Sequence, residues 1–174
     1  MKQTYSLSAW SLADLFPASD SPEMQAAFAD LEASVAAFET NRSRLAAGIS
    51  SADFLEIVGQ LEALNRKGGR VGAFAGLAFS GDTQNQAAQA FMARSDQFLT
   101  GLQNRSLFFE IWWKDLDETN AQRLLTASGD YRYWLEQMRQ FKPHTLSEPE
   151  EKIINIKNVT GSNAFAILYD SIPN

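Results

Sequence analysis

The chain has 174 residues, of which 45% are apolar and 21% charged, so its composition excludes a disordered or collagen-like protein. It has no cysteine and one histidine, His144. This excludes a disulfide scaffold, a cysteine nucleophile and any metal motif that needs two histidines from this segment. The formal net charge of −6 argues against nucleic acid as a partner, because a phosphate backbone attracts basic surfaces.

Neither a membrane span nor a secretory signal is visible in the sequence. No apolar run approaches the roughly 20 residues of a membrane-spanning helix, and residues 1–6 lack the apolar stretch of a signal peptide. We therefore expect no membrane contact and a cytoplasmic location.

The first predicted element is a long amphipathic helix over residues 22–49. Its apolar positions, from Met24 to Ile49, recur in steps of three and four. Asp20 or Ser21 can cap its start, and Pro22 suits the first helical position. Such a helix would be about 40 Å long, which favours a hairpin or an elongated bundle.

A second helix is predicted to begin at Ser50 or Ser51 and to reach a glycine-rich stretch. The glycines that recur every four residues there are Gly68, Gly72 and Gly76. We favour a continuous helix whose glycine stripe allows close packing, with a hinge at Gly68 and Gly69 as the alternative. A phosphate-binding loop is disfavoured, because no Gly-Lys-Ser/Thr follows and no strand precedes.

A third long helix follows a turn near residue 81. Asp82 or Thr83 is expected to cap it, and its apolar stripe runs from Ala87 to Leu116. The tight spacing of this stripe predicts that the helix packs against the two before it.

Short helices are predicted beyond the third long one. The next carries Ala121 and Leu125 and closes at Gly129, and another is capped by Asp130 and stopped by Pro143. These breaks imply a compact cluster of short elements at one end of the molecule.

Two further helices complete the chain. Ser147 and Glu150 have the Ser-x-x-Glu spacing of a capping box, and a final helix is expected from Ser162 or Asn163 to Tyr169. No strand alternation is evident, so we predict an all-α fold: a single domain over residues 1–174, with antiparallel long-helix hairpins and shorter helices packed at one end.

His144 and Glu148 have the i, i+4 spacing that can place two metal ligands on one helix face. Pro143 and the capping Ser147 put both residues in a loop that enters a helix instead. The sequence supplies neither a nucleophile nor an orienting partner for His144. We therefore assign no metal, cofactor-binding or catalytic residue.

Adjacent carboxylates offer a second candidate chemistry, glycoside hydrolysis. Glu150 and Glu151 diverge by about 100° on a helix, so they cannot both face one bond. Asp115, Asp117 and Glu118 form a similar acidic group. Solvated helix N-termini explain both groups better.

Aromatic residues are dense between positions 98 and 141. Most are expected in the core. The pairs Phe108 and Phe109, and Trp112 and Trp113, each point in two directions, so one neighbouring helix cannot bury all four. We expect part of this surface to remain exposed and to meet a partner, a further domain or a peptide.

Several stretches together resemble the amino-terminal region of the oligoendopeptidase F family of zinc metallopeptidases. They are residues 9–16 (AWSLADLF), 78–83 (AFSGDT), 107–110 (LFFE), 139–154 (RQFKPHTLSEPEEKII), Thr160-Gly161 and 168–170 (LYD). The resemblance covers essentially the whole chain, and the run from Lys142 to Glu151 is its most specific part.

The resemblance implies a helical peptidase of about three times this length that cleaves short peptides in an enclosed cavity. Its zinc would be held by an H-E-x-x-H helix and a later glutamate, all beyond Asn174. This chain would then be a catalytically inert amino-terminal lobe that walls the cavity. Its partners would be the catalytic domain and, in the full-length enzyme, short peptides.

The alternative is a free-standing helical interaction or scaffold protein that binds through the surface of Trp112 and Trp113. For a lobe cut from a larger enzyme, we expect an exposed apolar patch or self-association. An H-E-x-x-H motif encoded downstream would favour the peptidase, and a stop codon after Asn174 would favour the alternative.

Overall fold

The computed structural model describes residues 11–172, and within that range every regular element is helical, which confirms the all-α prediction. Ala9 and Trp10 of the resembling stretches lie outside the described residues. The elements are α1 (Pro22–Glu39), η1 (Thr40–Arg44), α2 (Ser51–Gly81), α3 (Gln86–Asp115), α4 (Glu118–Ala127), η2 (Gly129–Tyr131), α5 (Arg132–Gln140), η3 (Lys142–His144), α6 (Glu148–Thr160) and α7 (Ser162–Ser171).

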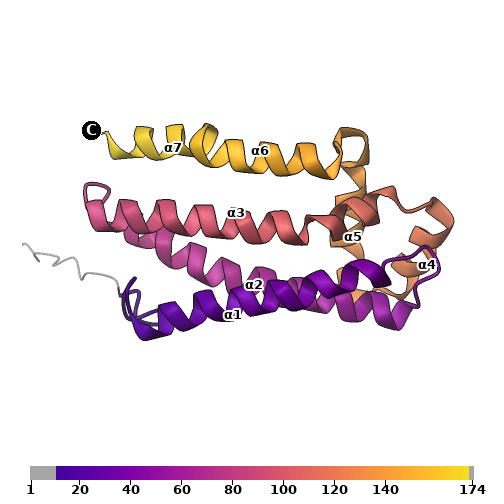
Figure 1. Cartoon of the computed structure of the whole chain (residues 1–174). Coiled ribbons are helices and arrows are strands. Elements are labelled where there is room, and N and C mark those ends of the chain that lie inside the picture. Colours follow the sequence, from indigo (N-terminus) through magenta and orange to yellow (C-terminus); the bar gives the residue numbers. More distant parts are fainter. Residues whose placement is uncertain (1–10, 173–174) are drawn as a thin grey trace, which may run out of the picture.

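The long helices α1, α2 and α3 form an elongated bundle of antiparallel neighbours (Figure 1). The shorter α4 and α5 cluster at one end, as predicted. From that end α6 returns along α3, and α7 continues in nearly the same line (Figure 1). We refer to α6 and α7 together as the C-terminal arm.

Aromatic side chains dominate the core where the three long helices meet α5. Phe54 on α2 stacks on Phe109 with ring centroids 6.1 Å apart and lies 5.1 Å from Trp113. Phe38 on α1 also contacts Phe109, with ring centroids 6.3 Å apart. Each such pair stabilises the fold by about 0.5–1.5 kcal/mol beyond the apolar area that it buries.

The prediction of one helix over residues 22–49 is wrong beyond Glu39. Ser21 does cap α1, through its hydroxyl and the amide of Met24 at 3.2 Å. The chain then tightens into η1, where the buried Asn41 donates to Gln60 on α2 at 2.6 Å. This contact between distant residues diverts the chain toward α2 and ends the α-helix.

Helix α2 runs unbroken through Gly68 and Gly69, as we favoured, so no hinge exists there. A Cβ at Gly68 or at Gly72 would lie 3.3 Å from the Leu99 side chain of α3. These two glycines therefore allow close packing. A Cβ at Gly76 would meet nothing within 4 Å, so the packing interpretation does not extend to that residue.

The predicted cap of α3 at Asp82 or Thr83 is wrong, because Asn85 performs that role. Its side-chain oxygen accepts hydrogen bonds from the amides of Ala87 and Ala88 at 3.0 and 3.1 Å. Asp82 instead ends α2 and accepts from the amide of Gln84. The chain needs these additional residues to reverse direction before a helix can restart.

The α4–α5 junction also differs from expectation. Gly129 does follow the end of α4, and its positive φ of 52° is a conformation that glycine adopts without strain. Asp130 does not cap α5, since η2 leads directly into that helix with Tyr131 as its preceding residue. The Tyr131 hydroxyl donates to Glu62 on α2 at 2.7 Å.

The capping box at the start of α6 is confirmed. Ser147 accepts from the amide of Glu150, and the Glu150 carboxylate accepts from the amide of Ser147 at 3.0 Å. Helix α7 begins at Ser162, as predicted, and extends to Ser171. Local sequence signals were thus sufficient for both helix starts in the C-terminal arm.

Candidate functional site

The structure places His144 in η3 and Glu148 at the first position of α6. Glu148 forms ion pairs with Arg42 and with Lys152, the latter at 2.7 Å. Burial raises the pKa of Glu148, but hydrogen bonds from Lys152 and Arg42 outweigh it, and the pKa is lowered overall. Glu148 therefore joins α6 to the bundle and has cationic partners of its own.

The other carboxylates also have local roles. Glu151 accepts from the amide of Leu146 at 2.9 Å, and Asp117 caps α4 by accepting from the amide of Asn120 at 3.0 Å. Glu118 pairs with Arg139 at 3.1 Å. Among residues 11–172, no group of three or more His, Cys, Asp or Glu side chains could hold a metal ion.

The expectation that part of the aromatic surface between positions 98 and 141 stays exposed is confirmed, but the exposed residues are chiefly Tyr133, Trp134 and Phe141 and not the tryptophan and phenylalanine pairs. Phe108, Phe109 and Trp113 are buried, and Trp112 is half-buried against the core. Trp113 donates its indole N–H to the backbone oxygen of Leu135 on α5 at 2.9 Å. Several helices surround α3, so side chains that point in different directions from it are all buried or partly buried.

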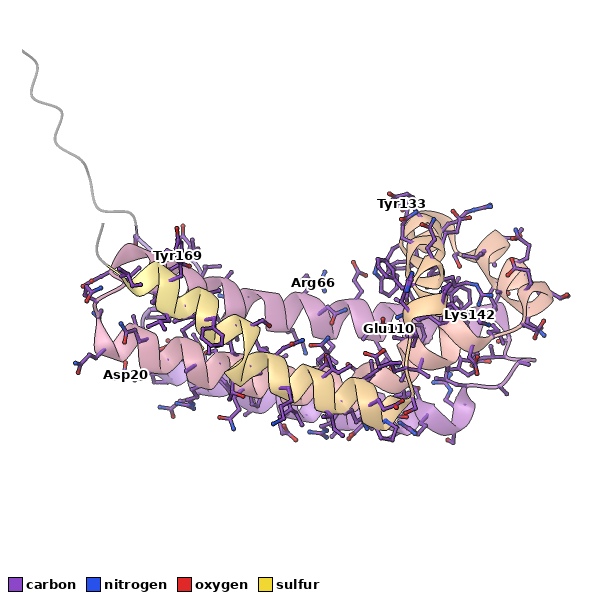
Figure 2. All side chains as sticks on the ribbon, turned by 90° about the horizontal axis from the view of Figure 1, so that it is seen from above. Asp20, Arg66, Glu110, Tyr133, Lys142 and Tyr169 are labelled. Atoms are coloured by element: carbon purple, nitrogen blue, oxygen red, sulfur yellow. The ribbon has the colours of Figure 1, made fainter. Side chains whose placement is uncertain are left out.

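Most of the exposed large apolar side chains lie on the C-terminal arm. Phe165 and Tyr169 on α7 are 71% and 77% exposed, and none of the described side chains of α6 and α7 belongs to the apolar core. Figure 2 shows Tyr169 on α7, far from the α5 end of the bundle. We call the following set the outer apolar surface: Ile153, Ile154, Ile156, Phe165, Leu168, Tyr169 and Ile172.

Polar contacts hold the arm against α3. Asn155 donates to the side-chain oxygen of Asn104 at 2.8 Å, and Asn104 donates to the backbone oxygen of Lys152 at 3.3 Å. The ion pair between Arg42 and Glu148 secures the start of α6. Helix α6 thus turns polar side chains toward the bundle and leaves its isoleucines exposed.

A groove lies between α2 and α3 and is closed at one end by α5. Its volume is about 770 Å³, within the range of ligand pockets. Glu110, labelled in Figure 2, lines the groove from α3. Its apolar wall includes Leu61, Leu64, Leu99, Leu102, Trp134 and Phe141.

Sequence reasoning predicted an exposed apolar patch but did not place it on α6 and α7, and it missed the groove. Nothing local shows which side of a helix packs on its neighbours. The run of glycines was noticed, but only the α2–α3 pairing shows that Gly68, Gly69 and Gly72 line a groove.

Comparison with known protein families gives a match that includes the C-terminal arm. Residues 112–172 match a protein-family model described as oligopeptidase F. The predicted family resemblance is therefore confirmed over this stretch. No curated protein and no solved structure matches the chain.

The stretch matched by the oligopeptidase F model runs from the end of α3 to the end of α7. It thus includes the capping box, the C-terminal arm and all of the outer apolar surface. In the part of the chain that the structure describes, no helix is long and apolar enough to cross a membrane.

Proposed function

We propose that residues 1–174 form the amino-terminal lobe of an oligoendopeptidase F-like zinc endopeptidase that cleaves short peptides. The lobe walls the substrate cavity and has no activity by itself. One observation carries this proposal: the outer apolar surface lies wholly within the stretch that matches oligopeptidase F. Exposed apolar surface of this kind marks an interface, so we propose that it packs against the catalytic domain.

The proposal places the metal of the enzyme outside this lobe. The described residues offer no three-ligand group, whereas a catalytic zinc takes three protein ligands. His144 follows Pro143 in η3 and has no second histidine anywhere in the chain. The zinc ligands of the proposal therefore come from another part of the enzyme, and no catalytic step is assigned to residues 11–172.

The first experiment determines the coding sequence that follows the codon for Asn174. We expect an H-E-x-x-H motif encoded roughly 200 residues or more after Asn174, in a helix that would carry two zinc ligands and a general base. A stop codon directly after Asn174 would contradict the peptidase proposal. The outer apolar surface would then support the free-standing interaction protein, although through α6 and α7 and not through Trp112 and Trp113.

The second experiment tests the interface. The chain is co-expressed with the separately encoded catalytic domain, and copurification and cleavage of a quenched fluorescent peptide are measured. Phe165→Ser combined with Leu168→Ser should abolish copurification and reduce cleavage. Tyr133→Ser is the matched control, because Tyr133 is 72% exposed but lies on α5. Equal copurification of all three proteins would exclude the arm as the interface.

The isolated chain is also expected to self-associate through the same surface. Sedimentation equilibrium should show a concentration-dependent mass that falls toward the 19.3 kDa monomer in the Phe165→Ser, Leu168→Ser variant. A wild-type chain that is monomeric at all concentrations would remove this expectation without affecting the gene-level test.

A further inference from the structure

The exposed side of α6 carries an acid, two isoleucines and a base in a regular order. Glu150, Ile153, Ile154 and Lys157 have the i, i+3, i+4, i+7 spacing, so they share one helix face about 100° wide. All four are exposed, Ile153 at 58% and Ile154 at 41%. Asn155, which contacts α3, lies about 150° away around the helix. The four residues therefore form a stripe that faces away from the bundle, at whose edge α6 lies (Figure 1).

Both charges of this stripe are able to pair with a partner. Within residues 11–172, no other residue forms a hydrogen bond or an ion pair with the Lys157 ammonium. Oε2 of Glu150 accepts from the amide and the hydroxyl of Ser147, at 3.0 and 2.5 Å, whereas no described residue donates to its Oε1. Covering a charge without a counter-ion is unfavourable. The best partner for the isoleucines therefore also brings an acid to Lys157 and a base to Glu150.

The stripe is complementary to itself when its direction is reversed. Consider two α6 helices that run antiparallel about a two-fold axis midway between Ile153 and Ile154. Each Glu150 then lies opposite the other copy's Lys157, because both charges are equally far along the helix from the axis. At the axis Ile153 meets Ile153 of the second copy, and Ile154 meets Ile154. A two-fold pair of this kind is the commonest symmetry of soluble oligomers.

We propose that α6 pairs in this antiparallel arrangement with the α6 of a second copy of the chain. Two Glu150–Lys157 ion pairs flank four isoleucines in the contact. The charge complementarity selects the second copy and also the direction, since a parallel pair would place like charges side by side. The inference rests on the self-association expected under the proposed function, and it specifies the geometry. In the full-length enzyme the second copy and the catalytic domain would compete for α6.

Sedimentation equilibrium of the isolated chain and its charge variants tests the ion pairs. Lys157→Glu sets like charges opposite each other and should weaken the dimer by at least about tenfold. Adding Glu150→Gln to this variant removes the repulsion and should restore part of the affinity, and glutamine preserves the capping box. Arg66→Glu is the matched control, because Arg66 is exposed on α2 and the net charge changes equally. It should dimerise like the wild type.

The direction of the helices is tested by crosslinking. The chain has no cysteine, so a single introduced cysteine reports on its own neighbour in the dimer. Ile153→Cys should form a disulfide between two copies in oxidised glutathione, because the two positions meet at the axis. Lys157→Cys should not, since in the antiparallel pair these positions lie about 10 Å apart along the helices, too far for a disulfide.

The possible results separate this inference from the others. A wild-type chain that is monomeric at all concentrations would overturn both the pairing and the expected self-association, and would leave the peptidase proposal as it is. A dimer that Lys157→Glu does not weaken would overturn the pairing alone, because the contact would then be apolar without a fixed register. Crosslinking of Lys157→Cys would overturn the antiparallel arrangement.

Discussion

The three-helix bundle and the C-terminal arm use their apolar side chains in opposite ways. In the bundle, Phe38, Phe54 and Phe109 meet in a closed core, and Arg105 on α3 pairs with Glu32 and Glu39 on α1 at the surface. In the arm, Asn155 and Glu148 make the contacts with the bundle, while the apolar residues remain exposed.

This difference shows why it matters which side of a helix faces the bundle. A helix that turns its polar side chains toward the bundle leaves its apolar side chains available to a partner. The bundle buries most of its large apolar side chains among its own helices. The arm leaves large apolar side chains exposed, which is unfavourable in water. The proposed contact outside residues 11–172 would account for this exposure, and the arm lies within the stretch that matches oligopeptidase F.

The sharpest test of the comparison replaces one phenylalanine in each region. Phe109→Ala should lower the free energy of unfolding by about 3–5 kcal/mol, because it leaves a cavity among buried rings. Phe165→Ala, at a 71% exposed position, should change it by no more than about 0.5 kcal/mol. Urea denaturation followed by circular dichroism measures both. Similar losses in the two variants would show that the arm has its own core.

The junction between α6 and α7 should be disrupted by the addition of a single methyl group at Gly161. A Cβ at Gly161 would lie 2.8 Å from the backbone oxygen of Lys157, closer than real contacts allow. Gly161→Ala should therefore displace or fray α7, at a cost of about 1–3 kcal/mol. Hydrogen exchange should accelerate in α7 and stay unchanged in α1–α3. Gly101→Ala is the control without a clash, and unchanged exchange in α7 would contradict the prediction.

The polar attachment of the arm can be weakened separately. Asn155→Leu removes the hydrogen bond to Asn104. The packing of α6 on α3 should therefore lose about 1 kcal/mol of stability. Faster exchange of the α6 amides is the expected readout. Asn163→Leu, at an exposed position of α7, should leave the α6 amides unaffected. If Asn155→Leu slows exchange, the attachment is apolar and the comparison between the regions fails.

The smallest expected effect is a pH dependence that belongs to the bundle. A hydrogen bond from Arg105 lowers the pKa of Glu39 below its usual value. A carboxyl group with a lowered folded-state pKa stabilises the fold above its unfolded-state pKa, near 4.3, and the stabilisation is lost as the pH falls through the folded-state pKa.

Thermal unfolding between about pH 5 and pH 2 tests this contribution. Glu39→Gln should flatten the decline in melting temperature over that range. Glu23→Gln, at an exposed position in the first turn of α1, should leave the slope nearly as in the wild type. Parallel slopes for Glu39→Gln and wild type would show that the Arg105 contact is unimportant in solution.

Helix starts could be predicted where the signal lies within a few residues. Ser21, Ser50 and the pair of Ser147 and Glu150 cap their helices as expected, because a cap is a contact between near neighbours in the chain. The end of α1 could not be predicted. It depends on Asn41 meeting Gln60, nineteen positions later in the chain.

The candidate surfaces could likewise be predicted only in part from the sequence. The periodicity of the sequence predicted helices through Ile153 and through Gly69, and the structure has both. It could not show that Trp112 and Trp113 would be covered from several sides, or that the isoleucines of α6 would not be.

The sequence by itself determined an all-α chain, most of its helix starts and its resemblance to the oligoendopeptidase F family, because these depend on local spacing and residue type. Only the tertiary structure decided which apolar residues are buried, where α1 ends and that Gly69 borders a groove. Burial depends on which helix faces which, and that choice is made by contacts between residues far apart in the chain.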